Sequence, residues 1–349
     1  MQVVFSESHR LHDPTAQVEA GHRIPMQETP SRAEQIISSL AQDARFEIVE
    51  PKTFGRAPID SVHEPAMVSY IEHAHAEWSA ASGFDIAIPD VFFHPALRAG
   101  MEPIADAESP LGRLGYWCFE TTTPIVAGTY TAARSAVDSA LTATDTVLGG
   151  ASNAYALCRP PGHHAATSVF GGYCFFNNAA IAAQHAVAKG AERVAVLDVD
   201  YHHGNGTEQI FYERPDVFYA SLHGDPARAY PYFLGFADET GTGRGNGRNL
   251  NIPLEAGCEN DMYLSELTRA LDAIDSYNPE VLFVSLGLDI FGGDPLGDLA
   301  ITTDGIGRIG AAIRARSMPT VILQEGGYAV SELGNNAHAF LDKFVSLSS

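Results

Sequence analysis

Four short motifs in this sequence carry side chains that could do chemistry together. The first, Asp198-Val-Asp-Tyr-His-His-Gly-Asn-Gly-Thr207, directly follows the apolar residues 194–197. Side chains alternate along a strand, so we expect Asp198, Asp200 and His202 to share one face at the end of a strand. Carboxylates and an imidazole that converge there suit a divalent transition metal. A solvated polar turn is the alternative, but three ionisable residues directly behind an apolar run argue against it.

The second motif, Leu157-Cys-Arg-Pro-Pro-Gly-His-His164, presents two adjacent histidines from a rigid turn. Such a pair can serve as acid–base groups or as metal ligands, and on its own it is often incidental. The nearby Phe170-Gly-Gly-Tyr-Cys-Phe-Phe-Asn-Asn178 adds weight, because its glycines permit close backbone approach and its aromatics could wall a narrow slot. For Phe175 and Phe176 we prefer core packing.

Two further motifs follow apolar runs. In Ser285-Leu-Gly-Leu-Asp289, the carboxylate would complete a three-ligand metal set with Asp200 and His202, which leaves a position open for water and substrate. A helix N-cap is the alternative role for this aspartate. In Gln324-Glu-Gly-Gly-Tyr328, the glycines would let the tyrosine hydroxyl stabilise an oxyanion. Of the histidines outside these motifs, His223 is the one that we most expect to lie near the site, because it follows a predicted strand.

The elements that must position these motifs are typical of an α/β protein. Short strands that are apolar on both faces are predicted at 193–200, 217–223, 281–287 and 320–323. Helices are predicted from a capping box at Ser31, at 127–148 and at 177–189. Buried strands that alternate with helices indicate a parallel sheet between two helix layers. The motifs follow the carboxyl ends of strands, where such sheets place their ligands.

The length of the chain and the distribution of its glycines and prolines favour one catalytic domain over residues 1–349. Glycine and proline are spread along the chain, without a linker or repeat. Residues 85–124, rich in Pro, Gly and aromatics, predict a long surface loop, and loops of this kind are often functional or form subunit contacts.

Composition excludes several classes of partner. The 349 residues carry 43 acidic against 21 basic side chains, a net charge of −22, which disfavours nucleic acid and anionic membranes. With 45% hydrophobic residues the chain can bury a large core, so disorder is excluded. No secretory signal or bilayer-spanning run is visible. Four cysteines without C-x-x-C spacing indicate a reducing compartment, so we expect a cytoplasmic protein.

Taken in order, the motifs resemble the arginase–deacetylase superfamily, and within it the bacterial acetylpolyamine amidohydrolases of the histone-deacetylase-like enzymes. Phe5-Ser-Glu-Ser-His-Arg10, Pro30-Ser-Arg-Ala-Glu34 and Ala220-Ser-Leu-His-Gly-Asp225 extend the resemblance over nearly the whole chain. It implies a single-domain fold with a central parallel sheet of about eight strands and helices on both faces.

The resemblance also implies two metal ions. One zinc ion per chain would be held by Asp200, His202 and Asp289. A structural potassium ion would fix the zinc-bearing loop. Its ligands would be Asp198, Asp200, His202, Ser221 and Leu222.

The catalytic roles implied by the resemblance fit amide hydrolysis. His164 would be the general base and then the acid, with Asn205 behind it, where deacetylases acting on proteins often have an aspartate. We expect that difference to alter the pKa of His164. His163, paired with Asp198, would be a charged electrostatic helper. Tyr328 would hydrogen-bond the scissile carbonyl.

The same resemblance assigns the substrate-binding residues. Tyr173 and Tyr230 would form aromatic walls, and Gly172 and Gly326 would line the site. Acetylpolyamine hydrolases hold the distal ammonium groups with acidic side chains. Here Thr122 and Leu111 occupy those positions, and Glu120 and Glu108 are the acids nearby.

The leading hypothesis is therefore a zinc amidohydrolase acting on a small N-acyl amine of the acetylpolyamine type, active as a homodimer through residues 85–124. The missing acids raise an alternative, a neutral small amide, including xenobiotic organophosphate amides of the dimethoate type. A protein acetyl-lysine deacetylase ranks lower, because a narrowed mouth would exclude folded proteins. An arginase-like dimanganese enzyme would need more carboxylates, and an inactive acyl-binding module would not need every catalytic residue.

Overall fold

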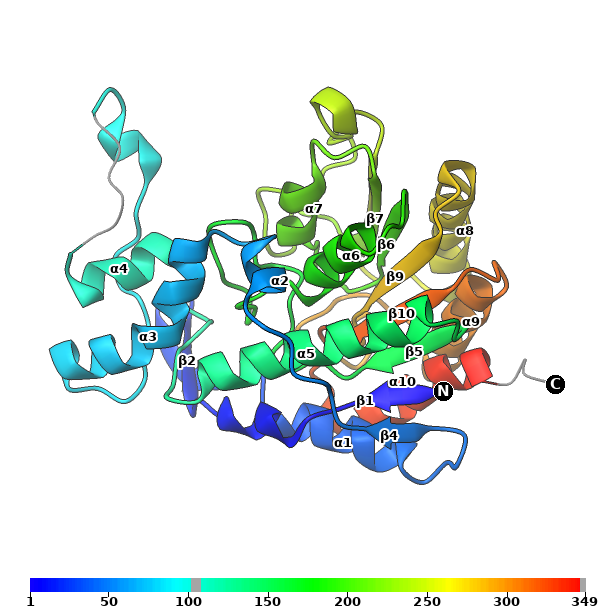
Figure 1. Ribbon diagram of the computed structural model, residues 1–349, viewed down its shortest axis with the longest axis horizontal. Coiled ribbons are helices and arrows are strands. Elements are labelled where there is room, and N and C mark those ends of the chain that lie inside the picture. Colours follow the sequence, from blue (N-terminus) through cyan, green and yellow to red (C-terminus); the bar gives the residue numbers. More distant parts are fainter. Residues whose placement is uncertain (102–107, 346–349) are drawn as a thin grey trace.

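The computed structural model describes residues 1–101 and 108–345, and its centre is an eight-stranded parallel sheet (Figure 1). The strand order is β4-β1-β5-β10-β9-β6-β7-β8, and each neighbouring pair is parallel. The strands are β1 (Gln2–Val4), β4 (Glu47–Val49), β5 (Asn153–Ala156), β6 (Val194–Asp198), β7 (Val217–Gly224), β8 (Asn249–Leu254), β9 (Val281–Leu286) and β10 (Thr320–Gln324). A separate antiparallel hairpin pairs β2 (Ala16–Glu19) with β3 (His22–Pro25). The predicted α/β class and parallel sheet are confirmed.

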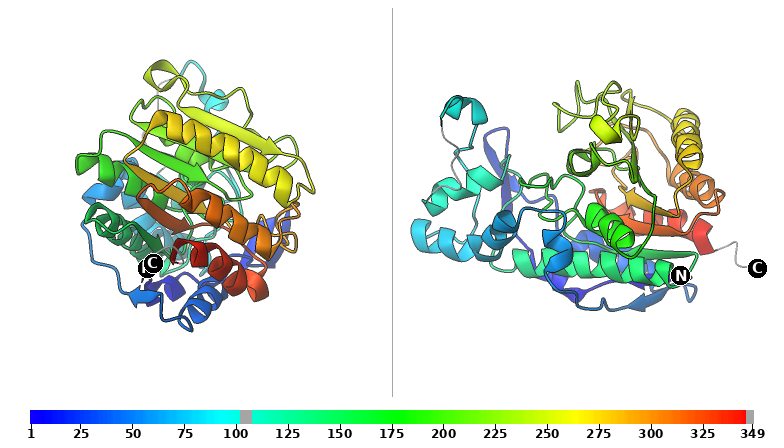
Figure 2. Two further views of the ribbon diagram at one scale, coloured as in Figure 1. Left: turned by 90° about the vertical axis from the view of Figure 1, so that its right-hand side faces the viewer. Right: turned by 45° about the horizontal axis from the view of Figure 1, so that its top comes forward.

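Helices cover both faces of the sheet. One face carries α1 (Pro30–Leu40), α8 (Asn260–Tyr277), α9 (Thr303–Arg314) and α10 (Val330–Val345). Figure 2 shows α8, α9 and α10 side by side on that face. The other face carries α2 (Ala57–Asp60), α5 (Thr129–Leu148), α6 (Asn178–Ala188) and α7 (Asn205–Phe211). Further out lie α3 (Pro65–Ser82), α4 (Pro110–Trp117) and the 3-10 turns η1 (Glu7–Leu11), η2 (Pro95–Arg98) and η3 (Gly243–Gly245).

Alternation along the strands explains why they are apolar throughout. In β6, Val194 and Val196 pack into the core beneath α5 and α6, whereas Ala195 and Leu197 pack into the core beneath α8 and α9. Because both faces are buried, every position of the strand needs an apolar side chain. The polar side chains therefore begin only where the strand ends.

The predicted strand through Asp200 is too long. β6 ends at Asp198, so Asp200 and His202 lie in the following turn and not on a strand face with Asp198. Side chains bend the chain here, because Asp198 Oδ1 accepts the backbone N–H of Asp200 and Asp200 Oδ1 accepts that of His202. Aspartate side chains that bond the backbone two residues on make turns of this kind.

The start of the first predicted helix is also slightly different. The capping box implied a cap at Ser31, but α1 already begins at Pro30, after Thr29. Proline is favoured in the first turn of a helix, where its missing N–H has no intrahelical partner to lose.

Residues 85–124 leave and rejoin the body at a bridge between Ala87 and Ile125. Their described parts include η2 and α4, and the segment around η2 projects away from the sheet (Figure 1). Among all the described residues, no helix is both long and apolar enough to cross a bilayer.

Candidate active site

Three predicted metal ligands come together at the carboxyl edge of the sheet. Asp200 and His202 follow β6, and Asp289 follows the neighbouring strand β9. Nδ1 of His202 lies 3.3 Å from Asp200 Oδ1 and 3.1 Å from Asp289 Oδ2. The ligand atoms of all three lie within 4.8 Å of one another. Two ligand atoms of a tetrahedral zinc site are about 3.3 Å apart, so the donor set fits such an ion.

The electrostatics of this group also fit a cation. Burial raises the pKa of Asp289 to about 7, and the charge of Asp200 adds to that shift. Although burial alone would lower it, hydrogen bonds to Asp200 and Asp289 raise the pKa of His202 to about 9. Two buried carboxylates this close together need a neighbouring positive charge. A divalent ion would supply that charge in place of a proton.

A glycine leaves room for that ion. Gly326 donates its backbone N–H to Asp200 Oδ2 at 2.8 Å. A Cβ at this position would overlap Asp289 Oδ2 and lie 2.6 Å from Asp200 Oδ2. A side chain at position 326 would fill the space between the two carboxylates, so this position requires glycine.

His163 lies beside two of the carboxylates. Its Nδ1 is 3.1 Å from Oδ2 of Asp198, the last residue of β6, and its Nε2 is 3.8 Å from Asp200 Oδ1. Burial would lower its pKa, but Asp200 and Asp198 raise the pKa of His163 to about 10. The imidazole is therefore charged at neutral pH.

His164 has the opposite environment. Its Nδ1 is 2.7 Å from Oδ1 of Asn205, the first residue of α7, and its ring lies 4.0 Å from that of His163. Burial and the neighbouring charges of His163 and His202 hold the pKa of His164 well below its usual value. Since Asn205 Oδ1 can only accept, the proton sits on Nδ1 and Nε2 is unprotonated. One histidine is charged and its neighbour is a neutral base.

Three tyrosines surround the histidines and the carboxylates. Tyr173 and Tyr328 have ring centroids 5.7 Å apart, and Tyr230 meets the ring of His164 edge-on at 5.0 Å. Burial raises the pKa of Tyr328 well above its usual value, so its phenol keeps its proton. Asp294 Oδ2 accepts the backbone N–H of Tyr328 at 2.6 Å.

Gly172 and Tyr173 sit in a tight, left-handed turn against His164. Their φ angles are +59° and +66°, and a Cβ on Gly172 would overlap the His164 ring. The Tyr173 N–H donates to Thr123 Oγ1 at 2.7 Å, and its hydroxyl bonds to Gln17 of β2. The tyrosine is thus fixed at both ends.

Glu120 lies beneath this turn. Its Oε1 accepts the Gly172 N–H at 3.0 Å and the Thr123 hydroxyl, and its Oε2 accepts the N–H and hydroxyl of Thr122. Both oxygens are therefore occupied by protein donors. Glu108 is exposed in the projecting segment.

The predicted potassium ligands lie next to the metal group. Asp198 and Ser221 are register partners in β6 and β7, and Leu222 is buried beside them. Ser221 Oγ lies 2.7 Å from Nδ1 of His223, whose Nε2 lies 2.8 Å from the Gly235 carbonyl oxygen. As expected, His223 lies close to the site, where it connects β7 to the loop after Tyr230.

The match to known families decides which class of protein this is. The model for the Histone deacetylase domain matches residues 26–344. The chain belongs to this histone deacetylase family. It is 44% identical over 337 residues to acetylpolyamine amidohydrolase 1 of Pseudomonas aeruginosa, which covers 97% of this chain and 96% of that relative. It is 42% identical over 336 residues to the acetylpolyamine amidohydrolase of Mycoplana ramosa, with 96% and 97% covered.

Solved structures agree with that membership. The crystal structure of an acetylpolyamine aminohydrolase from Burkholderia pseudomallei matches with a TM-score of 0.93 at 41% identity, over 99% of both chains. The enzyme is therefore an amidohydrolase of the deacetylase type, as the resemblance implied.

Several residues of this deacetylase site had no role in the sequence-based prediction. Glu325 Oε2 accepts the backbone N–H groups of Gly162 and His163, and its Oε1 accepts the Ser285 hydroxyl. Arg32 contacts the loop of Tyr328. Glu325 belongs to the Gln-Glu-Gly-Gly-Tyr motif that ends at Tyr328. Its place in that motif is the sequence feature that could have identified it as a site residue.

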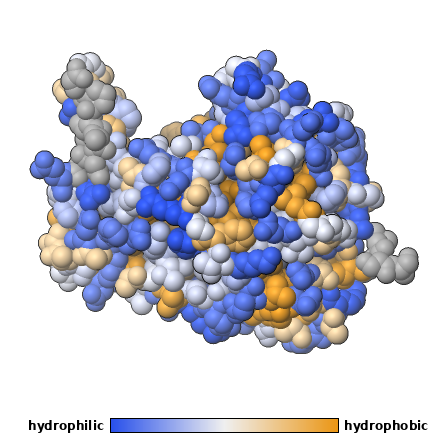
Figure 3. Space-filling view, in the orientation of Figure 1, coloured by the Kyte–Doolittle hydropathy of each residue, from blue (hydrophilic) through white to orange (hydrophobic). Residues whose placement is uncertain are grey.

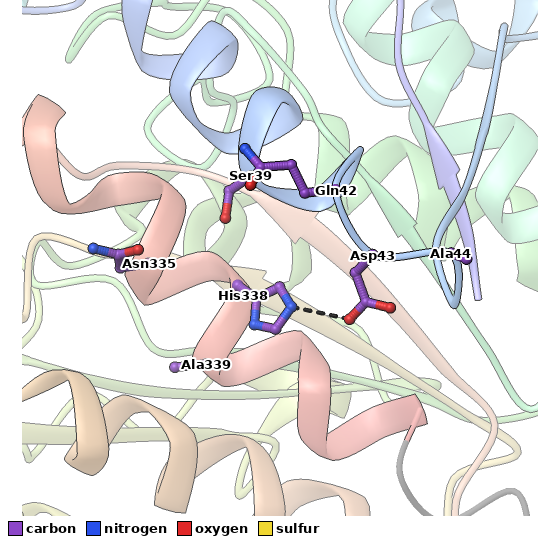
Figure 4. A pocket seen from close by; sticks show the side chains of 7 residues that line it. All are labelled: Ser39, Gln42, Asp43, Ala44, Asn335, His338 and Ala339. Atoms are coloured by element: carbon purple, nitrogen blue, oxygen red, sulfur yellow. Dashed lines mark hydrogen bonds and ion pairs between the residues drawn. The ribbon is translucent and has the colours of Figure 1, made fainter.

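Two open hollows lie away from the deacetylase site, and neither contains a predicted site residue. One lies between α1 and α10, where His338 and Asp43 face each other at 3.1 Å (Figure 4). The other lies at the amino ends of β1, β4 and β5. The carboxyl edge of the sheet remains the place where reactive side chains converge.

Proposed function

We propose that this deacetylase-family enzyme hydrolyses the amide bond of a small N-acyl amine of the acetylpolyamine class, with one zinc ion per chain. The observation that carries the proposal is the convergence of a metal-ligand group, a neutral His164 and a protonated Tyr328 at one edge of the sheet. The relatives named as acetylpolyamine amidohydrolases support the substrate class.

The chain's own residues would divide the reaction between them. A divalent ion held by Asp200, His202 and Asp289, when bound, would polarise the amide carbonyl and acidify a water molecule. His164 would take the proton of the attacking water on Nε2 and later give it to the leaving amine. Tyr328 would donate its phenol proton as a hydrogen bond to the carbonyl oxygen as negative charge develops there.

His163 and Asp198 would act by charge and by position. The His163 imidazolium lies between Asp198 and Asp200, so it offsets their charge while it lowers the basicity of His164. The lowered pKa keeps His164 unprotonated at neutral pH, so its Nε2 is available as a proton acceptor. Tyr173 and Tyr230 would flank the acyl amine, with Gly172 and Gly326 as the close backbone surfaces.

The proposal includes one catalytic ion and one structural ion. Among residues 1–101 and 108–345, a single group of three side chains could hold a metal, which favours one zinc over a pair of manganese ions. A structural potassium ion would be held by Asp198, Asp200, His202, Ser221 and Leu222. Removal of potassium should weaken zinc retention.

A second candidate is a neutral small amide, of which an organophosphate amide is one example. The observation that favours it is Glu120, because both of its carboxylate oxygens already accept hydrogen bonds from the protein. Thr122 and Leu111 add no charge. A substrate ammonium would then find little unpaired negative charge beside the aromatic rings.

Competition kinetics separate the two candidates. Acetylputrescine, acetylspermidine, an acetyl-lysine peptide and simple N-alkyl amides are assayed singly and in pairs. The polyamine proposal expects acetylputrescine to be the best substrate and to inhibit turnover of the neutral amide. Turnover of a neutral amide that excess acetylputrescine does not slow would replace it with the second candidate.

We further propose one catalytic domain over residues 1–349 that acts as a cytoplasmic homodimer. The projecting segment exposes Val91 (65%), Leu97 (75%) and Met101 (61%), and it stands clear of the body in the space-filling view (Figure 3). Exposed apolar patches of this kind mark contact surfaces. Light scattering on Leu97→Asp should show a monomer where the wild type is a dimer. Four buried free thiols fit a reducing compartment.

A further inference from the structure

A buried charged cluster joins the loop that carries Tyr328 to the turn that carries His163 and His164. We propose that Arg32 and Glu28 are positioning residues, which hold the Tyr328 phenol in register with the histidines. The inference rests on the catalytic role proposed above for Tyr328.

Arg32 contacts both the backbone of the loop that carries Tyr328 and the Tyr328 ring. Its Nε donates to the Gly327 carbonyl oxygen at 2.5 Å and its Nη2 to the Glu325 carbonyl oxygen at 2.7 Å. Its Cζ lies 4.6 Å from the centroid of the Tyr328 ring. A guanidinium over an aromatic face is attracted to it, so the same group fixes both the backbone of the loop and the orientation of the ring.

Glu28 connects Arg32 to the segment that carries His163 and His164. Its Oε1 accepts from Nη1 of Arg32 at 2.6 Å and from Nε of Arg159 at 2.8 Å. Arg159 is the first residue of the Arg-Pro-Pro-Gly-His-His motif, and its other nitrogens donate to the carbonyl oxygens of His9 and Glu28. One carboxylate therefore bridges the two catalytic segments.

The cluster is buried in full. Glu28, Arg32 and Arg159 are each at most 3% exposed, and Arg32 lies in the first turn of α1. Buried ions are costly unless they are paired with good geometry, and replacement by apolar residues is often no less stable. Stability alone thus does not explain two arginines on one glutamate. Their contacts to Gly327, Glu325 and the Tyr328 ring supply a positional reason.

The phenol must be accurately placed to act. A misplacement of about 1 Å at a reacting centre can cost about a hundredfold in rate, even when the substrate still binds. Tyr328 follows two glycines, and Gly327 has a φ of +119°, so the loop needs an external support. Asp294 holds the backbone N–H of Tyr328, and Arg32 holds the ring.

A double-mutant cycle tests the inference. Arg32→Met and Arg32→Lys are made in the wild type and in Tyr328→Phe, and kcat, KM, metal content and thermal unfolding are measured. Arg32→Met should lower kcat about tenfold or more in the wild type with KM nearly unchanged, and by less than about threefold in Tyr328→Phe. Lysine keeps a charge opposite Glu28 and should restore part of kcat. Arg316→Met, at a remote ion pair with Asp272, should leave kcat unchanged.

A second readout does not need turnover. The dissociation constant of acetohydroxamate for the zinc-loaded protein is measured in the same variants, because a hydroxamate carbonyl can accept the Tyr328 hydrogen bond. The inference expects Arg32 and Tyr328 to couple there as well. If the wild type hydrolyses none of the amides, the substrate proposal fails and the hydroxamate cycle still decides this one. Equal losses from Arg32→Met in both backgrounds, or none in either, would overturn it.

Discussion

Asn205 Oδ1 lies 2.7 Å from Nδ1 of His164, while the adjacent His163 faces a carboxylate, Asp198, at 3.1 Å. Two neighbouring histidines thus have partners of different charge. The amide orients the imidazole of His164 without stabilising its protonated form as strongly as a carboxylate would.

Asn205→Asp should therefore raise the pKa of His164. The general base is active when neutral, so the acidic limb of the kcat/KM profile should move to higher pH. The pH dependence of kcat/KM, with metal content measured in parallel, checks this. An acidic limb that stays in place would mean that His164 is not the titrating base.

Tyr328→Phe removes the phenol proton donor and keeps the ring. Loss of one oxyanion-stabilising donor costs roughly a hundred- to thousandfold in kcat, and we expect a loss of that order with metal content intact. The matched control is Tyr277→Phe, which deletes a hydroxyl bonded to the Pro215 carbonyl oxygen far from the site. Equal activity of the two variants would remove Tyr328 from the mechanism.

Gly326→Ala should impair metal binding. The added Cβ would fall between Asp289 and Asp200, where the ion would be held. Gly55→Ala is the control, because a Cβ there meets nothing within 4 Å. Zinc per chain, measured by elemental analysis after dialysis, should fall for Gly326→Ala and remain at the wild-type value for the control. Full zinc retention by both would show that the ion binds elsewhere.

The raised pKa of Glu208 predicts how the free energy of unfolding depends on pH. It is 4% exposed, and burial, with repulsion from Glu239, raises its pKa to about 7. A carboxyl whose pKa is higher in the folded state stabilises the fold at low pH, and that stability is lost as pH rises through about 7. A neutral amide at this position avoids the loss.

Glu208→Gln should therefore be more stable than the wild type at pH 8, by on the order of 2 kcal/mol, and the difference should shrink towards pH 5. The glutamine oxygen can still accept from Asn249 and Asn251, as Glu208 Oε1 does. Chemical denaturation at both pH values measures the difference. Exposed Glu50→Gln is the control, and a pH-independent gain in Glu208→Gln would point to a cause other than titration.

The sequence predicted the meeting of distant side chains because each motif follows a parallel strand. Asp200 follows β6 and Asp289 follows β9, and these strands are neighbours. Alternation within a strand did not apply to Asp200 and His202, because the carboxylates of Asp198 and Asp200 accept backbone N–H groups two residues on and turn the chain earlier. The assumption of a continuous strand was therefore wrong for Asp200 and His202, although the prediction that they lie together with Asp289 was correct.

The cluster of Glu28, Arg32 and Arg159 could not be predicted from local sequence patterns. Its contacts join residues 131 and 295 positions apart, and charged side chains in a sequence ordinarily indicate solvent. Glu120 was named as a nearby acid, but its bonds to Gly172 and Thr123 depend on how residues 85–124 return to the body. Side-chain networks of this range need the tertiary structure.

Metal-dependent amide hydrolysis is tested most directly by removal and return of the ion. The purified protein is depleted with a chelator, assayed on acetylputrescine and on a neutral N-alkyl amide, and then titrated with zinc. We expect hydrolysis to disappear with the metal and to recover fully at one zinc ion per chain, with Asp289→Asn failing to recover. Undiminished hydrolysis by the metal-free protein, or recovery only at two ions per chain, would contradict the proposed site.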